Sequence, residues 1–162
     1  MSKKKPKHKA ISSVKKIPHK IESPSVKKKP ARDLSLSIES KSKNPVWRFG
    51  MVDFEGQWGW ENLNRVDDFK LIQGKLKNFE TMTWGEIEKK LIKKGTPQNH
   101  SIQVEKICKD AQDRLKEIKM DDRDELYSLR FSGKERLWGV REGEILYILW
   151  WDPYHTVCPI QS

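Results

Sequence analysis

The spacing of apolar and polar residues in the last third of the chain predicts β-strands. Three runs are rich in branched and aromatic residues and alternate in part with polar ones: 126–131, 136–141 and 145–151. The gaps between them hold Ser132-Gly133 and Glu142-Gly143, which are typical of hairpin turns. The last run, ILYILWW, is apolar at every position, which favours a central strand covered on both faces. We therefore expect an antiparallel meander.

Helical spacing comes earlier in the chain. Residues 66–79 and 101–120 repeat apolar residues every three or four positions, which predicts one amphipathic helix in each. Between these two helices, Thr83 and Glu86 have the spacing of a capping box. A third helix should therefore begin there and end near residue 95, where Gly and Pro follow.

The expected helix 101–120 has one apolar stripe and one charged face. Cys108 lies on the stripe and is expected in the core. On the charged face, Asp110 and Arg114 are four residues apart and can form an ion pair. The simplest interpretation of Arg114 is therefore a residue on a solvated helix face.

The segment 46–60, VWRFGMVDFEGQWGW, predicts a strand and the start of a second, with a turn at Glu55-Gly56. The order of elements is thus an extra N-terminal strand and helix segment, then a helix, then the meander. Helices followed by an antiparallel meander predict an α+β fold.

Charge is distributed unevenly and divides the chain at about residue 45. Residues 1–45 hold fourteen Lys and Arg against three acidic residues, whereas 46–162 hold nineteen basic and twenty acidic residues. All Trp, Tyr and Phe lie after residue 45. We expect a disordered basic tail over 1–45, an N-terminal extension packed on the core over 46–100, and a helix-plus-sheet domain over 101–162. The tail either attracts nucleic acid without sequence preference or only solubilises the protein.

Several classes of protein do not fit the sequence. No run approaches the roughly 18 apolar residues of a membrane span, and no apolar segment follows the first lysines as in a secretory signal. Cys108 and Cys158 are isolated, which suits a reducing cytosol, and no metal or cofactor site is visible. We expect a cytoplasmic protein that does not enter membranes. The run KKKPKHK also resembles a nuclear import signal, which leaves a chromatin-associated protein as a weaker alternative.

The first hairpin of the meander carries more positive charge than a buried hairpin normally does. Arg130, Lys134 and Arg136 lie within the stretch LRFSGKERLWGV. Burying an unpaired cation costs several kcal/mol, so these side chains either line a rim reached by water or are held ready for an anion. In the simpler alternative, Arg136 is an edge residue paired with a nearby glutamate such as Glu135 or Glu125.

The same hairpin carries a resemblance to a known family. The stretch SLRFSGKERLWGV, followed by Tyr154-His155, resembles the C-terminal half of RelE/ParE-superfamily toxins, most closely the YoeB-type members. Those proteins combine a helical hairpin with an antiparallel sheet. The resemblance covers the chain from residue 101 to His155 and implies a RelE-like fold for that part.

The resemblance also implies a function. Such toxins are small ribonucleases that cut messenger RNA, often on the ribosome, and are silenced by a cognate antitoxin protein. By position, Arg136 would stabilise charge on the scissile phosphate, and His155 would be the general acid, with Tyr154 orienting it or stacking on a base. The residues expected to bind flanking phosphates are Arg130, Lys134 and Arg141.

Two functions from different classes follow from these observations. The first is a metal-independent, toxin-type endoribonuclease, in which Arg136 and His155 converge on one exposed surface. Cleavage through the 2′-hydroxyl of RNA needs a base, an acid and cations around the phosphate, and this set can supply them. The second is a non-catalytic module that binds RNA or protein, in which Arg136 is paired and His155 points away. Trp150-Trp151 could stack on bases. Neighbouring strand residues face opposite ways, so at most one of the two could face a ligand, and we expect both in the core.

Overall fold

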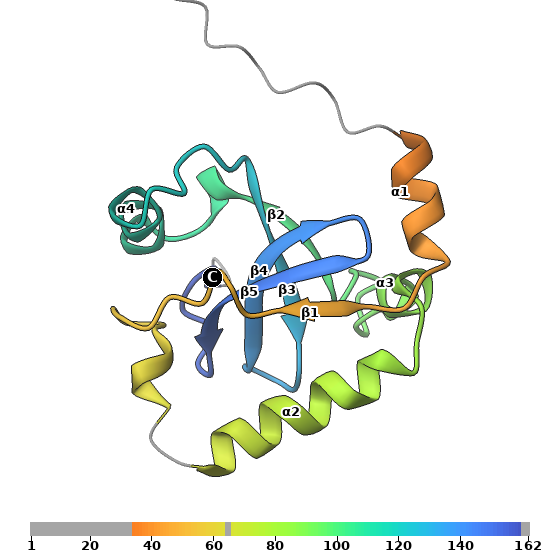
Figure 1. The fold of residues 1–162 in the computed structure, drawn as a ribbon, viewed down its shortest axis with the longest axis horizontal. Helices are drawn as coiled ribbons and strands as arrows, with labels where there is room; N and C mark the ends of the chain where they lie inside the picture. The colour runs from red at the N-terminus through yellow and green to blue at the C-terminus, as the bar shows by residue number, and fades with distance from the viewer. Residues whose placement is uncertain (1–33, 64–65, 160–162) are drawn as a thin grey trace, which may run out of the picture. The chain divides into compact units, whose positions relative to one another are not determined.

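The computed structural model describes residues 34–63 and 66–159, which form a five-stranded sheet with helices on both faces. The strand order is β1-β5-β4-β3-β2 (Figure 1). β2 to β5 pair antiparallel, as expected for a meander, and β1 pairs parallel with β5. The strands are β1 (Val46–Arg48), β2 (His100–Gln103), β3 (Glu125–Arg130), β4 (Arg136–Glu142) and β5 (Ile145–Asp152).

The helices lie mostly before the meander, so the α+β class is confirmed. They are α1 (Leu34–Lys41), α2 (Val66–Glu80), α3 (Trp84–Lys89) and α4 (Lys109–Glu117), with 3₁₀ turns at Trp60–Asn62 and Val104–Lys106. Both halves of the predicted capping box are present, since Thr83 Oγ1 accepts from the Glu86 N–H and the Glu86 carboxylate accepts from the Thr83 N–H. Within the described residues, no helix is long and apolar enough to cross a membrane.

The core has two layers, one on each face of the sheet. On one face, α2 and α3 pack on the sheet through Leu76, Phe79 and Trp84. On the other face, α4 packs through Ala111 and Leu115. β5 is covered on both sides, because its apolar run contributes residues to both layers, with a break in the alternation at Leu149 and Trp150, where the register between β4 and β5 shifts. Trp150 and Trp151 are both buried, as predicted.

Three secondary-structure predictions are wrong in part. The first residues of the segment 101–120 belong to β2, and α4 begins only at Lys109, because pairing with β3 overrides the helical spacing. Cys108 is the half-buried N-cap residue of α4. α3 ends at Lys89 instead of running to about residue 95. The segment 46–60 forms one strand of three residues and an irregular loop, with no second strand.

The N-terminal boundary also differs from the prediction. α1 falls inside the tail 1–45 that we expected to be disordered, so that expectation fails for 34–41; residues 1–33 lie outside the described part of the chain. The end of this segment is tied to α3, since the Lys43 carbonyl accepts from the Trp84 N–H at 3.0 Å. β1 then joins the sheet itself.

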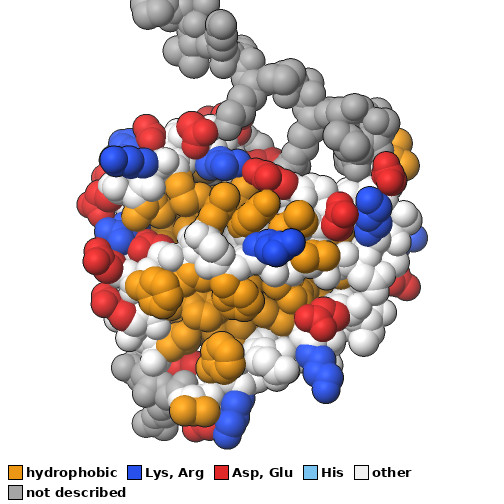
Figure 2. All heavy atoms as spheres, in the orientation of Figure 1, with side chains coloured by type: hydrophobic (Ala, Val, Ile, Leu, Met, Phe, Trp, Pro, Cys, Tyr) orange, Lys and Arg blue, Asp and Glu red, His pale blue; other side chains and the backbone are white. Residues whose placement is uncertain are grey.

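Apolar side chains remain exposed where the chain leaves β1. Figure 2 shows hydrophobic side chains gathered on the face that carries β1 and the segment after it. Phe49 and Phe54 are 50% and 64% exposed. Since β1 pairs on one side with β5, this region is the edge of the sheet.

Candidate functional site

The predicted hairpin brings two arginines side by side at one end of the sheet. β3 ends at Arg130, β4 begins at Arg136, and these two residues are directly paired across the strands. On the other side of β4, Arg136 is paired with Asp152, the last residue of β5. The three strand ends therefore place two cations and one carboxylate in a row; we call Arg130 and Arg136 the arginine pair.

Arg136 is buried, with only 6% of its surface exposed. Its Nη1 donates to three backbone carbonyls of the β3–β4 turn, those of Ser132 at 3.2 Å, Gly133 at 3.2 Å and Glu135 at 3.0 Å. Within the described residues, its Nε and Nη2 have no hydrogen-bond partner. Burial and the neighbouring charge of Arg130 lower the pKa of the Arg136 guanidinium, and Asp152 acts in the opposite direction. The turn thus fixes one nitrogen and leaves two for another acceptor.

Arg130 binds the same turn. Its Nε donates to the Ser132 carbonyl at 2.8 Å and its Nη2 approaches the Gly133 carbonyl at 3.4 Å. Within 34–63 and 66–159, no carboxylate forms an ion pair with either member of the arginine pair. Like charges placed directly opposite each other on a sheet are destabilising, so this arrangement costs stability and favours an anionic ligand at this end of the sheet.

Asp152 forms no ion pair with either arginine, although it lies opposite Arg136 and its charge acts on that guanidinium. It is fully buried, and its oxygens accept from the backbone N–H groups of Thr156 at 2.9 Å and Val157 at 3.0 Å. The Thr156 hydroxyl and the Trp138 indole also donate to it, at 3.2 Å and 3.4 Å. Asp152 therefore binds the turn of residues 153–157, which we call the His155 turn.

His155 lies in that turn, half-buried and with a φ of +61°. Burial and the nearby charge of Arg136 lower the pKa of its imidazole, with a further contribution from Arg130, while Asp152 raises it. The charges of both arginines act on the His155 imidazole, so the histidine lies within electrostatic range of the arginine pair. Its ring has no hydrogen-bond partner in the described part of the chain. Tyr154, the preceding residue, is 74% exposed.

The other two predicted phosphate-binding residues differ in position. Lys134 is exposed in the β3–β4 turn, beside the arginine pair in sequence. Arg141 lies five residues along β4 from Arg136, roughly 16 Å away at the usual strand rise. Its guanidinium stacks on Trp84 at 4.0 Å and forms an ion pair with Glu88. Arg141 is therefore a structural cation and not part of this group.

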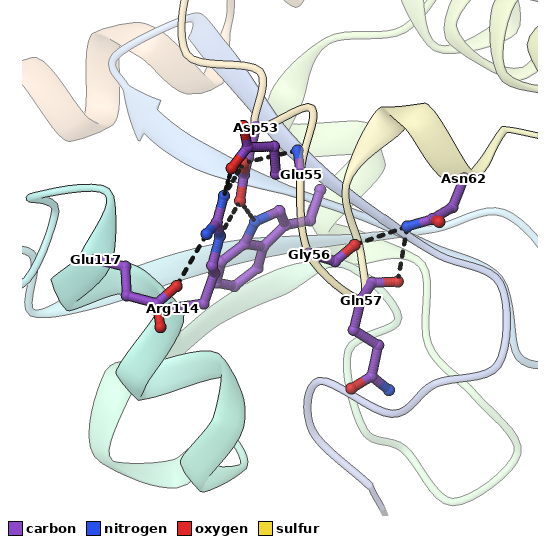
Figure 3. Close-up of polar contacts among 8 residues, drawn as sticks. Asp53, Glu55, Gly56, Gln57, Asn62, Arg114 and Glu117 are labelled. Carbon is purple, nitrogen blue, oxygen red and sulfur yellow. Dashed lines mark hydrogen bonds and ion pairs between the residues drawn. The ribbon is translucent and has the colours of Figure 1, made fainter.

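Sequence reasoning missed a second cluster of charge, shown in Figure 3. Arg114 was expected in solvent beside Asp110, but it binds the carboxylate of Asp53 through two hydrogen bonds of 2.8 and 2.7 Å. The Trp150 indole donates to the same carboxylate at 2.9 Å. Although burial raises the pKa of Asp53, the hydrogen bonds from Arg114 and Trp150 outweigh it and hold that pKa below its usual value. The cluster fastens the loop after β1 to α4 and β5.

The role of Asp152 was also missed, although the sequence contains a signal for it. An Asp at a strand end, with a Thr four residues later, can accept from the backbone beyond it and close a turn. No comparable signal pointed to Asp53 and Arg114, which are 61 residues apart.

A groove of about 430 Å³ lies apart from the arginine pair, between the loop after β1 and the end of α4. Met51, Met120 and Arg123 are among its lining residues, and none of the predicted site residues is. In the described part of the chain, no group of three or more His, Cys, Asp or Glu could hold a metal ion.

Comparisons with known proteins give no relative. No protein-family model matches the chain, and neither the curated proteins nor the solved structures contain a match.

Proposed function

We propose that this protein is a RelE-like, metal-independent endoribonuclease that cleaves messenger RNA at the arginine pair and His155. The observation that carries the proposal is a pair of facing arginines that form no ion pair with a carboxylate of the described residues, within electrostatic range of a histidine. Arg130 and Arg136 stand opposite each other with no carboxylate pairing with them among the described residues, and His155 is close enough for both charges to act on it. A phosphate between them would relieve the repulsion between the two guanidinium groups.

The arginine pair would bind the scissile phosphate. The Nη1 contacts of Arg136 hold its guanidinium in place, so Nε and Nη2 can form a preorganised bidentate contact with two phosphate oxygens. Arg130 adds a second positive charge next to it. Both charges stabilise the pentavalent phosphate, which carries more negative charge than the ground state. Lys134 would contact a flanking phosphate from the turn.

His155 would move the proton in this reaction. The resemblance implies that it acts as the acid, whereas its lowered pKa favours the neutral imidazole at pH 7, which is the form of a base. We therefore assign it first to removal of the proton from the 2′-hydroxyl. The 2′ oxygen then attacks phosphorus and the bond to the 5′ oxygen breaks. His155 returns its proton to that oxygen, leaving a 2′,3′-cyclic phosphate and a 5′-hydroxyl end. Tyr154 is exposed beside it and can stack on a base.

The deciding experiment measures RNA cleavage by the full chain with EDTA present, both on messenger RNA alone and in a purified translation system. We compare the wild type with Arg136→Ala and with His155→Asn. Asn is chosen because it tolerates the positive φ of this position. Arg48→Ala, which removes an exposed strand arginine on β1, is the matched control. Cleavage lost in the first two variants and kept in the control supports the proposal; no cleavage by the folded wild type in either system refutes it. Cleavage only with ribosomes assigns ribosome dependence.

One observation favours the second function, a non-catalytic module that binds RNA or a protein partner. Arg136 is almost completely buried, and both arginines donate to carbonyls of their own turn, which is also what a structural role requires. Under this alternative, RNA binds the wild type without being cut. Arg130→Ala would then weaken binding at low salt while no variant changes the RNA length.

A further inference from the structure

The turn that carries His155 is closed by a single buried carboxylate. Asp152 is fully buried, and its two oxygens accept from four donors. Two of them are the N–H groups of Thr156 and Val157, which directly follow the histidine. The third is the Thr156 hydroxyl and the fourth is the Trp138 indole. One side chain therefore accepts from three donors of a turn that has no regular secondary structure.

These contacts fix the backbone at the histidine. His155 has a φ of +61°, in the left-handed region that a histidine seldom adopts without support. The N–H of Thr156 belongs to the peptide plane directly after His155, so its hydrogen bond to Asp152 sets the orientation of that plane. The ring direction follows from the backbone, because φ and ψ restrict the side-chain rotamers.

A second contact ties the same turn to the loop after β1. The indole of Trp58 donates to the Thr156 hydroxyl at 2.8 Å. Trp58 is itself held, since its carbonyl accepts from the Trp151 N–H at 3.1 Å and it is 4% exposed. Thr156 thus lies between two anchored groups, Asp152 on one side and Trp58 on the other.

We propose that Asp152 is the positioning residue of His155, and that it sets both the left-handed turn of the histidine and the charge around its ring. The catalytic consequence rests on the proposed nuclease function, but the positioning itself does not. The charged groups that face His155 are Arg130 from β3, Arg136 from β4 and Asp152 from β5. Asp152 is the one among them that favours the protonated ring, so removing its charge should shift the histidine further toward its neutral form.

The test is the titration of the His155 ring by NMR in the full-length protein. The chain has four histidines, and the ring signal that is absent from the spectrum of His155→Asn is the signal of His155. Asp152→Asn removes the charge with little change of shape, and it replaces one accepting oxygen by an amide NH2, which can only donate. The matched control is Asp53→Asn, which also removes a buried carboxylate that accepts from a tryptophan indole. We expect the pKa of His155 to fall in Asp152→Asn and to stay unchanged in the control.

An unchanged His155 titration in folded Asp152→Asn would overturn the proposal. If that variant does not fold, hydrogen exchange of the wild type tests the proposal instead. The amides of Thr156 and Val157 should be protected by Asp152, because no backbone carbonyl accepts from them in the described residues. Rapid exchange of both amides would equally refute the assignment. If the nuclease exists, Asp152→Asn should lower kcat about 100-fold with little change in KM, the effect of a misplaced catalytic group. A titration shift without any RNA cleavage would keep Asp152 as the positioning residue and reject the nuclease.

Discussion

Replacing Arg114 with Met should destabilise the protein far more than an exposed ion pair would. Arg114 donates two hydrogen bonds to Asp53 and one to Glu117. Its side chain is 18% exposed and that of Asp53 is 5% exposed. The variant leaves the Asp53 carboxylate buried, and the donors that remain to it among the described residues are the Trp150 indole and the Glu55 N–H.

The size of the effect follows from what remains buried. Removing one partner of a buried ion pair costs about 3–5 kcal/mol. Because Asp53 keeps two donors, we expect the lower end, about 3 kcal/mol in the free energy of unfolding at pH 7. For a folded domain of this size that corresponds to a fall in Tm of roughly 10–15 °C. Urea unfolding, monitored by tryptophan fluorescence, measures the change in the free energy of unfolding.

The pH dependence gives an independent check. The folded pKa of Asp53 is lowered, so its contribution to stability is present above the unfolded pKa of about 4 and is lost as the pH falls through the folded pKa. In Arg114→Met the same carboxyl is buried without its cation and prefers to be protonated. The stability difference between the two proteins should therefore narrow below about pH 4.

The control is Lys116→Met on the same helix, which breaks an ion pair with Asp113 that lies in solvent. It should change the unfolding midpoint little. Our reasoning is refuted if Arg114→Met lies within about 1 kcal/mol of the wild type at pH 7, or if the difference persists unchanged in acid. The double variant Asp53→Asn/Arg114→Met should cost less than the sum of the single changes, since each removes the same interaction.

Four further changes test other parts of the structure. His155→Asn should flatten the pH dependence of the free energy of unfolding, because the lowered folded pKa of His155 makes the wild type lose stability as the pH falls through about 6.5 and below; acid unfolding curves measure this. Gly139→Ala should cost roughly 1–3 kcal/mol, because a Cβ there would lie 2.3 Å from the Tyr147 carbonyl oxygen. Gly74→Ala, inside α2 with nothing within 4 Å of the new Cβ, should instead stabilise by about 0.5–1 kcal/mol; thermal unfolding compares the two. Thr83→Ala should lower stability by about 1 kcal/mol through loss of the α3 cap, measured by urea unfolding.

The arginine pair is the part of the candidate site that the sequence predicts best. A short turn between two strands sets their register, so Arg130 and Arg136 had to lie near each other once the hairpin was recognised. The prediction that Arg141 binds a flanking phosphate was wrong, because five residues along β4 separate it from Arg136. The cation–π contact of Arg141 with Trp84 and its ion pair with Glu88 depend on α3, which is distant in sequence.

Signals between neighbouring residues were enough to predict the local elements. These are the meander, α2 and the capping box of α3, where spacing, turn residues and side-chain hydrogen bonds act within a few positions. Tertiary structure decided the rest. Residues 100–103 form β2 because they pair with β3. Arg114 is largely buried because the loop after β1 places Asp53 within hydrogen-bond distance of its guanidinium. The turn of His155 likewise depends on a tertiary contact, since the buried carboxylate of Asp152 needs donors and the N–H groups of Thr156 and Val157 supply two of them.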